Sequence, residues 1–181
     1  MTAKQKALIN ELVGYLPAEE KHIYGDIMDY FAELGYIPQK QKVSDFTLSF
    51  KHNVNGKVIG KVSVRKQKGC LRIKYFACED VPEKFIKALY DEAVANENRY
   101  SREVPPPDRA PIPKNVIMKK CTLSCTACTG GNMRYFIRFP DGREIFRCGA
   151  YPVLIPDITE SDMEQLKELV LKQHNYFLSI A

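Results

Sequence analysis

Four cysteines in the C-terminal half of the chain have the residue type and spacing of a metal site. Three form a C-x3-C-x2-C run and one stands further on, and the set is Cys121, Cys125, Cys128 and Cys148. Gly130-Gly131 follows the run and permits a tight turn that aims two thiolates at one ion. A hairpin between residues 134 and 147 would bring Cys148 back toward Cys128. Four thiolates suit tetrahedral zinc, so we expect a structural zinc site with zinc as the cofactor.

The same cysteines allow other interpretations. Reduced thiols pack as small hydrophobic side chains, and neighbouring thiols also support disulfide or redox chemistry. His174 could replace one cysteine as a ligand. The run also resembles the one by which radical S-adenosylmethionine enzymes hold an iron–sulfur cluster, but this resemblance covers eight residues. Ala127 stands where that family has an aromatic residue, and the 53 residues after Cys128 are too few for its barrel.

The sequence carries none of the common active-site motifs. It has no G-x-G-x-x-G, P-loop or G-x-S-x-G pattern. The three histidines, His22, His52 and His174, are far apart and are expected to be surface or interface residues. We expect Cys70 and Cys78 to be packing residues. Since a closed four-thiolate zinc site does no catalysis, the sequence favours a protein that is not an enzyme, without excluding one.

A basic sheet face is the second candidate site. Five basic residues alternate with apolar ones in three expected strands, and they are Lys51, Lys61, Arg65, Arg72 and Lys74. Such a face could hold phosphates by charge, or it could be an ordinary solvated sheet face. Sheets that bind RNA add stacking aromatics, for which only Phe76 is available here. The net charge of +5 permits an anionic partner without requiring one.

Hydrophobic periodicity predicts the elements that must position these residues. Apolar residues at helical spacing predict helices around residues 8–16 and 23–34. Alternation then predicts three antiparallel strands at 45–51, 58–65 and 71–76, with turns at Asn55-Gly56 and Lys68-Gly69. A helix over residues 81–96 follows, because Asp80 and Glu83 have the spacing of a capping box.

The C-terminal part repeats this order. Strands are expected at 134–139, 144–147 and 151–155, and Thr159 and Asp162 cap a long final helix. A duplicated pair of units is one hypothesis, and a common ββ(β)α arrangement is the other. We predict the α+β fold class. Its order is two N-terminal helices, a three-stranded antiparallel sheet and helix, then a second small antiparallel β unit with a long C-terminal helix.

Residues 101–115 contain five of the eleven prolines and suggest a boundary. Prolines favour extended geometry and remove amide donors. We interpret the segment as a linker between units 1–100 and 116–181, with a surface loop inside one domain as the alternative. A chain of 181 residues that is 45% hydrophobic folds as one domain or two small ones.

The C-terminal third of the chain resembles part of a known group of proteins. Residues 141–149 (DGREIFRCG), then Ile155-Pro156 and the capped helix to Phe177, resemble the C-terminal part of small uncharacterised bacterial proteins with clustered cysteines upstream. The resemblance implies a bacterial cytosolic protein and brings no activity or functional residue with it. The start of the chain is not a signal core, and no run reaches the roughly 18 apolar residues of a membrane span. We therefore expect a cytoplasmic protein.

Three functions follow as hypotheses. The first is a non-enzymatic binding or regulatory module with a structural zinc site in its C-terminal half. The second is a small-molecule enzyme with a pocket between the two units and a cysteine at its edge. The third is nucleic-acid binding through the basic sheet face, which ranks last because the charge is small. The expected partner is a small molecule or an anion, and no membrane is involved.

Overall fold

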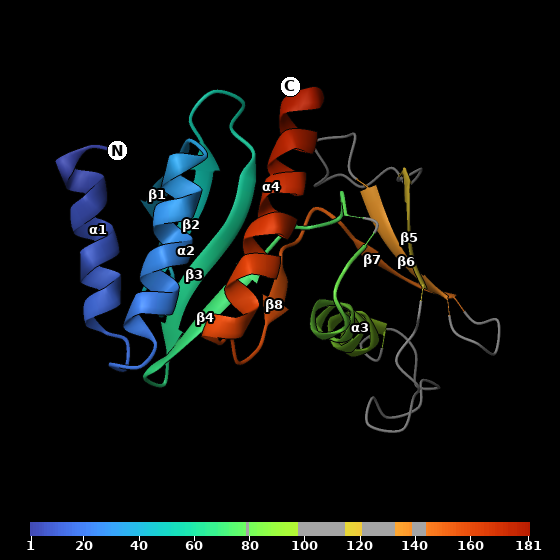
Figure 1. Ribbon diagram of the computed structural model, residues 1–181, viewed down its shortest axis with the longest axis horizontal. Helices are drawn as coiled ribbons and strands as arrows, with labels where there is room; N and C mark the ends of the chain where they lie inside the picture. Colours follow the sequence, from blue (N-terminus) through green and yellow to red (C-terminus); the bar gives the residue numbers. More distant parts are fainter. Residues whose placement is uncertain (79, 98–114, 121–132, 139–143) are drawn as a thin grey trace. The chain divides into compact units, whose positions relative to one another are not determined.

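The computed structural model describes residues 1–78, 80–97, 115–120, 133–138 and 144–181 (Figure 1). Its contacts divide the chain into two units. Unit 1 consists of Met1–Tyr75 and Ile155–Ala181, and unit 2 is Phe76–Leu154. The predicted linker at 101–115 lies outside the described residues, except for Asn115. The final helix belongs to unit 1, so this division differs from the one expected from the prolines.

Unit 1 is built on a five-stranded sheet with the order β1-β2-β3-β4-β8. The strands are β1 (Tyr36–Lys40), β2 (Thr47–His52), β3 (Val58–Arg65), β4 (Lys68–Ile73) and β8 (Val153–Ile155). The first four pair antiparallel in sequence. The helices are α1 (Ala3–Gly14), α2 (Lys21–Glu33) and α4 (Met163–Ser179), which lie over the same side of the sheet in Figure 1. The α+β fold class is therefore confirmed, with one strand added at each edge of the expected three.

The core of unit 1 lies between this sheet and its helices. The predicted helix faces are buried, including Ile9 and Leu12 of α1 and Ile27 and Phe31 of α2. The Phe31 ring packs against Phe50 of β2, with ring centroids 5.0 Å apart. The predicted capping box at Thr159 and Asp162 is also confirmed, ahead of the short helix η2 (Glu160–Asp162) that leads into α4.

The sequence did not predict β1, because its middle residue is Pro38. Proline cannot donate to a strand ladder and is confined to edge strands or bulges. In this sheet β1 is an edge strand. Gln41 N–H donates to the Thr47 carbonyl on the β2 side, so alternation turns the Pro38 nitrogen outward. Proline is therefore compatible with this strand and also protects its outer edge from pairing.

The turn between β3 and β4 lies two residues earlier than predicted. Arg65 pairs with Lys68, so the loop is Lys66-Gln67, and both residues have positive φ of 47° and 60°. Such two-residue loops match the twist of the flanking strands. Gly69 is instead inside β4, where an added Cβ would overlap the Tyr24 ring of α2. Glycine is needed there for close packing of helix on strand, not for the turn.

Unit 2 contains α3 (Glu83–Glu97) and an antiparallel sheet with the order β5-β6-β7. Its strands are β5 (Asn115–Lys120), β6 (Met133–Arg138) and β7 (Glu144–Cys148). The predicted hairpin of residues 134–147 is confirmed as β6 and β7. The expected third strand at 151–155 is β8, which joins the first sheet. The two halves thus have different strand arrangements, and the duplication hypothesis is wrong.

Candidate metal centre and histidine cluster

Of the four predicted zinc ligands, one lies within the described residues. Cys121, Cys125 and Cys128 lie outside the described residues. Cys148 is described, and it is a half-buried free cysteine at the end of β7. Within the described ranges, no three or more histidine, cysteine or acidic side chains gather as a metal site.

The register of the small sheet places the ends of the cysteine segment near Cys148. Lys120, the last residue of β5, is the cross-strand partner of Met133, the first residue of β6. The next residue of β6, Arg134, is the partner of Cys148. The chain that carries the C-x3-C-x2-C run connects Lys120 to Met133. It therefore leaves and re-enters the sheet at the end where β7 finishes with Cys148, and strands in a sheet are spaced about 4.8 Å apart.

The backbone around Cys148 is held by its neighbour Arg147. This guanidinium is only 6% exposed. One terminal nitrogen donates to the Tyr151 carbonyl at 2.8 Å, and the other donates to the Pro152 carbonyl at 3.0 Å. Arg147 also contacts the Cys148 carbonyl at 3.4 Å. The planar guanidinium of Arg147 thus holds the turn that follows β7 through several hydrogen bonds.

An ion pair connects this turn to α3. Arg147 pairs with the Glu92 carboxylate, whose second oxygen accepts the Leu154 N–H at 2.6 Å. Both side chains are largely buried, and charges removed from water need such partners. The pair therefore positions the chain from Cys148 to Leu154 against the helix. A site that depends on the placement of Cys148 would have a rigid support on this side.

The other two described cysteines, Cys70 and Cys78, lie outside the small sheet. Cys78 is buried, and Cys70 of β4 is half-buried. Burial raises the pKa of the Cys70 thiol, although Arg65 and Arg72 oppose this effect. A raised pKa keeps the thiol protonated and weakens it as a nucleophile. These properties fit the expected packing role.

The five residues of the predicted basic face occupy different environments. Lys61 and Arg72 are direct cross-strand partners, and Ser49 of β2 faces Lys61 on the other side. They alternate with the core residues of the helix-covered face, so they lie on the opposite face of the sheet. Arg65 pairs with Asp45 at 2.6 Å. Lys51 is exposed beside the β2–β3 turn. The Lys74 amine lies 5.9 Å from the centre of the Phe177 ring of α4.

Sequence reasoning missed a cluster of two histidines and a tyrosine in unit 1. Tyr36 and His52 are cross-strand partners, with ring centroids 5.0 Å apart. His174 of α4 brings its ring to 5.6 Å from His52, and its Nδ1 lies 3.3 Å from the Tyr36 hydroxyl. Burial raises the pKa of Tyr36, so its hydroxyl stays neutral. Burial, and then His52, lower the pKa of His174. The histidines are 122 residues apart in the chain, so no local pattern could reveal the cluster.

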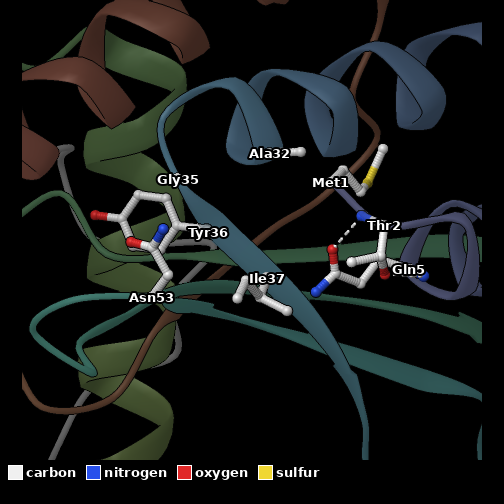
Figure 2. A pocket seen from close by; sticks show the side chains of 8 residues that line it. All are labelled: Met1, Thr2, Gln5, Ala32, Gly35, Tyr36, Ile37 and Asn53. Atoms are coloured by element: carbon white, nitrogen blue, oxygen red, sulfur yellow. Dashed lines mark hydrogen bonds between the residues drawn. The ribbon is translucent and has the colours of Figure 1, made fainter.

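A pocket of about 340 Å³ lies beside this cluster. Figure 2 shows Tyr36 and Asn53 at one end, Thr2 and Gln5 at the other, and Ile37 between them. The Gln5 amide oxygen accepts the Thr2 N–H at 2.7 Å as part of the α1 capping box. The eight lining residues include no carboxylate, thiol or imidazole. The polar side chains of the pocket are therefore the hydroxyls of Thr2 and Tyr36 and the amides of Gln5 and Asn53.

Comparison of the chain with family models, curated proteins and solved structures finds no match. None of the helices in the described part of the chain is long and apolar enough to cross a membrane. Any functional assignment therefore depends on the residues described above.

Proposed function

We propose that this protein is a non-enzymatic binding or regulatory module whose unit 2 is stabilised by a structural zinc ion. The ligands are the four cysteines predicted from the sequence, Cys121, Cys125, Cys128 and Cys148. The observation that supports this proposal is the strand register. It brings both ends of the three-cysteine segment to the end of the sheet where Cys148 stands.

The size of unit 2 also supports a metal. Phe76–Leu154 spans 79 residues, and domains below roughly 80 residues often need a disulfide or a metal to reach useful stability. The cytosol, which we propose as the compartment, disfavours disulfides. Arg147 and Glu92 hold the backbone after Cys148, which reduces the entropy lost when this ligand binds.

Metal content of single cysteine variants tests the proposal. Native mass spectrometry of protein purified without chelator should show about one zinc per chain. Cys148→Ser should lose most of this zinc, since a hydroxyl is a poor zinc ligand. Cys70→Ser is the matched control, because Cys70 is also half-buried and free but lies in unit 1. Equal zinc content in the two variants would contradict the assignment of Cys148.

Chelation provides a second, regional readout. Metal binding free energy is also folding free energy in small metal domains. Hydrogen exchange with a chelator should therefore rise first in β5, β6 and β7, while β2, β3 and β4 of unit 1 keep their protection. Uniform loss of protection in both sheets would show that the metal does not act on unit 2 alone.

The paired Lys61 and Arg72 favour a second candidate, the binding of a single-stranded nucleic acid on the sheet face opposite the helices. Two cations at directly paired positions attract phosphates together, and such binding weakens steeply with salt. Fluorescence anisotropy with a labelled RNA oligomer should show binding at low ionic strength. Lys61→Glu should abolish it, while Lys6→Glu on α1 should not. Absence of binding at low ionic strength would eliminate this candidate.

The small-molecule enzyme stays a prediction with less support. The pocket beside β1 has a suitable size for a small ligand, but its lining belongs to unit 1 and includes no cysteine, so it is not the pocket that the sequence predicted. The proposed zinc site adds no catalytic group, because four thiolates leave no open position on the metal.

A further inference from the structure

The C-terminal half of α4 rests on the end of the sheet where the two histidines meet. His174 contacts Tyr36 and His52, and the Phe177 carbonyl accepts the Asn55 side-chain amide at 3.2 Å. Asn55 belongs to the turn between β2 and β3. These contacts, together with the buried side chains of Gln173 and Phe177, hold the last turns of the helix in place.

The ring of His52 is held by the turn between β2 and β3. Its Nδ1 accepts the N–H groups of Val54 and Asn55, each at 3.4 Å. Since backbone amides only donate, Nδ1 is the acceptor in both hydrogen bonds. The other ring nitrogen, Nε2, faces Gly35, where an added Cβ would lie 3.2 Å away. Both nitrogens of His52 are therefore enclosed by backbone.

The same geometry argues against a metal at this cluster. The Nδ1 of His52 is occupied by two amides, its Nε2 faces the backbone at Gly35, and the Nδ1 of His174 is directed to a tyrosine hydroxyl. A metal ion would need at least two of these nitrogens as ligands, with open space between them for the ion. The cluster is therefore better suited to respond to protons than to bind a cation.

We propose that His52 and His174 form a proton-sensitive latch, which holds the C-terminal half of α4 on the sheet at neutral pH and releases it in mild acid. Two imidazolium ions at this separation would repel each other. Tyr36 is only 1% exposed and stays neutral, so it supplies no counter-charge. Charged groups around this part of α4 include Lys74, over the Phe177 ring, and Lys172, which pairs with Glu168.

The direction of the pH effect follows from His174. Its pKa is lowered in the folded state, first by burial and then by His52, relative to an unfolded value near 6.5. The attached state thus binds fewer protons than the released state. The helix is therefore fully attached at pH values above the unfolded pKa of His174. Attachment weakens as the pH falls below that pKa toward the lower pKa of the folded state. Each unit of difference in pKa changes the attachment equilibrium about tenfold.

Hydrogen exchange of α4 tests the latch. After correction for intrinsic exchange, protection of amides in residues 171–179 should fall between about pH 7.5 and about pH 5.5, by up to about tenfold, which is the limit for one histidine with an unfolded pKa near 6.5. His174→Gln should remove most of this fall, because glutamine keeps polarity and does not titrate. His22→Gln is the matched control and should retain the fall, since His22 is exposed and pairs with Glu160.

Two results would overturn the latch. One is unchanged protection of residues 171–179 in the wild type across this pH range. The other is a fall of the same size in His174→Gln, which would assign the pH response to other groups. If His174→Gln proves too unstable to measure, His174→Phe offers a second non-titrating ring at the same position. The zinc proposal concerns unit 2 and stands or fails independently of these results.

Discussion

Removal of the Arg147 guanidinium should destabilise unit 2 by about 3–5 kcal/mol. Arg147→Met keeps most of the side chain's apolar length and removes every donor. The variant loses the bonds to the Tyr151 and Pro152 carbonyls and the ion pair with Glu92. Since Glu92 is itself only 19% exposed, its carboxylate would remain largely buried without this partner.

The magnitude comes mainly from the loss of the guanidinium beside the largely buried Glu92 carboxylate. Hydrogen bonds to charged groups contribute about 1.5–3 kcal/mol each, and a buried ion left without its partner accounts for the upper part of the range. Adding Glu92→Gln should recover about 1 kcal/mol or more, because the amide is neutral and can still accept the Leu154 N–H. The double variant should therefore be more stable than Arg147→Met alone.

Urea unfolding followed by far-ultraviolet circular dichroism measures these differences. Lys87→Met is the matched control, because Lys87 pairs with Asp91 on the same helix but is 54% exposed. Surface pairs contribute about 0–1 kcal/mol, so this variant should unfold almost as the wild type does. Equal stabilities of Arg147→Met and Lys87→Met would refute the view that Arg147 holds the chain after β7.

Two further predictions concern glycine in unit 1, and thermal unfolding measures both. Gly69→Ala should lower the free energy of unfolding by about 1–3 kcal/mol, because its Cβ would overlap the Tyr24 ring. Gly25→Ala, whose Cβ has open space around it in α2, should raise this free energy by about 0.5–1 kcal/mol. If both variants changed stability in the same direction, the packing argument would be contradicted. Gln67→Gly should stabilise the protein by about 1 kcal/mol, because φ is 60° at this residue. Lys68→Gly, inside β4, should destabilise the protein. A destabilised Gln67→Gly variant would contradict the assigned turn.

Local patterns predicted the elements whose burial is repetitive along the chain. Helix α2 was predicted because Ile23, Ile27 and Phe31 recur at helical spacing and are all buried. Strands β2 to β4 were predicted because apolar and polar residues alternate along their sequences. The capping box at Thr159 was equally visible, since its two members are three residues apart.

Features that depend on distant pairing could not be predicted in this way. Strand β8 was expected at 151–155 as part of a second sheet, but its pairing with β4, about eighty residues earlier in the chain, was not predicted. Gly69 signals a turn in the sequence, but its role is set by Tyr24 of α2. The Arg147–Glu92 pair and the His52–His174 pair join residues that share no local motif.

The candidate zinc site was predicted from spacing alone. Of its four members, Cys148 is the one that the structure describes, and its position at the end of β7 was expected from the hairpin. The register also shows what spacing could not. The three-cysteine segment begins and ends at cross-strand partners, Lys120 and Met133, next to the strand that carries Cys148.

X-ray absorption at the zinc edge tests the central claim most directly. Protein purified without chelator should contain zinc with a first shell of four sulfurs at about 2.3 Å. Cys148→Ser should lose the zinc or show a shell with fewer sulfurs. A metal-free wild-type protein, or zinc bound mainly through oxygen and nitrogen, would contradict the four-cysteine site.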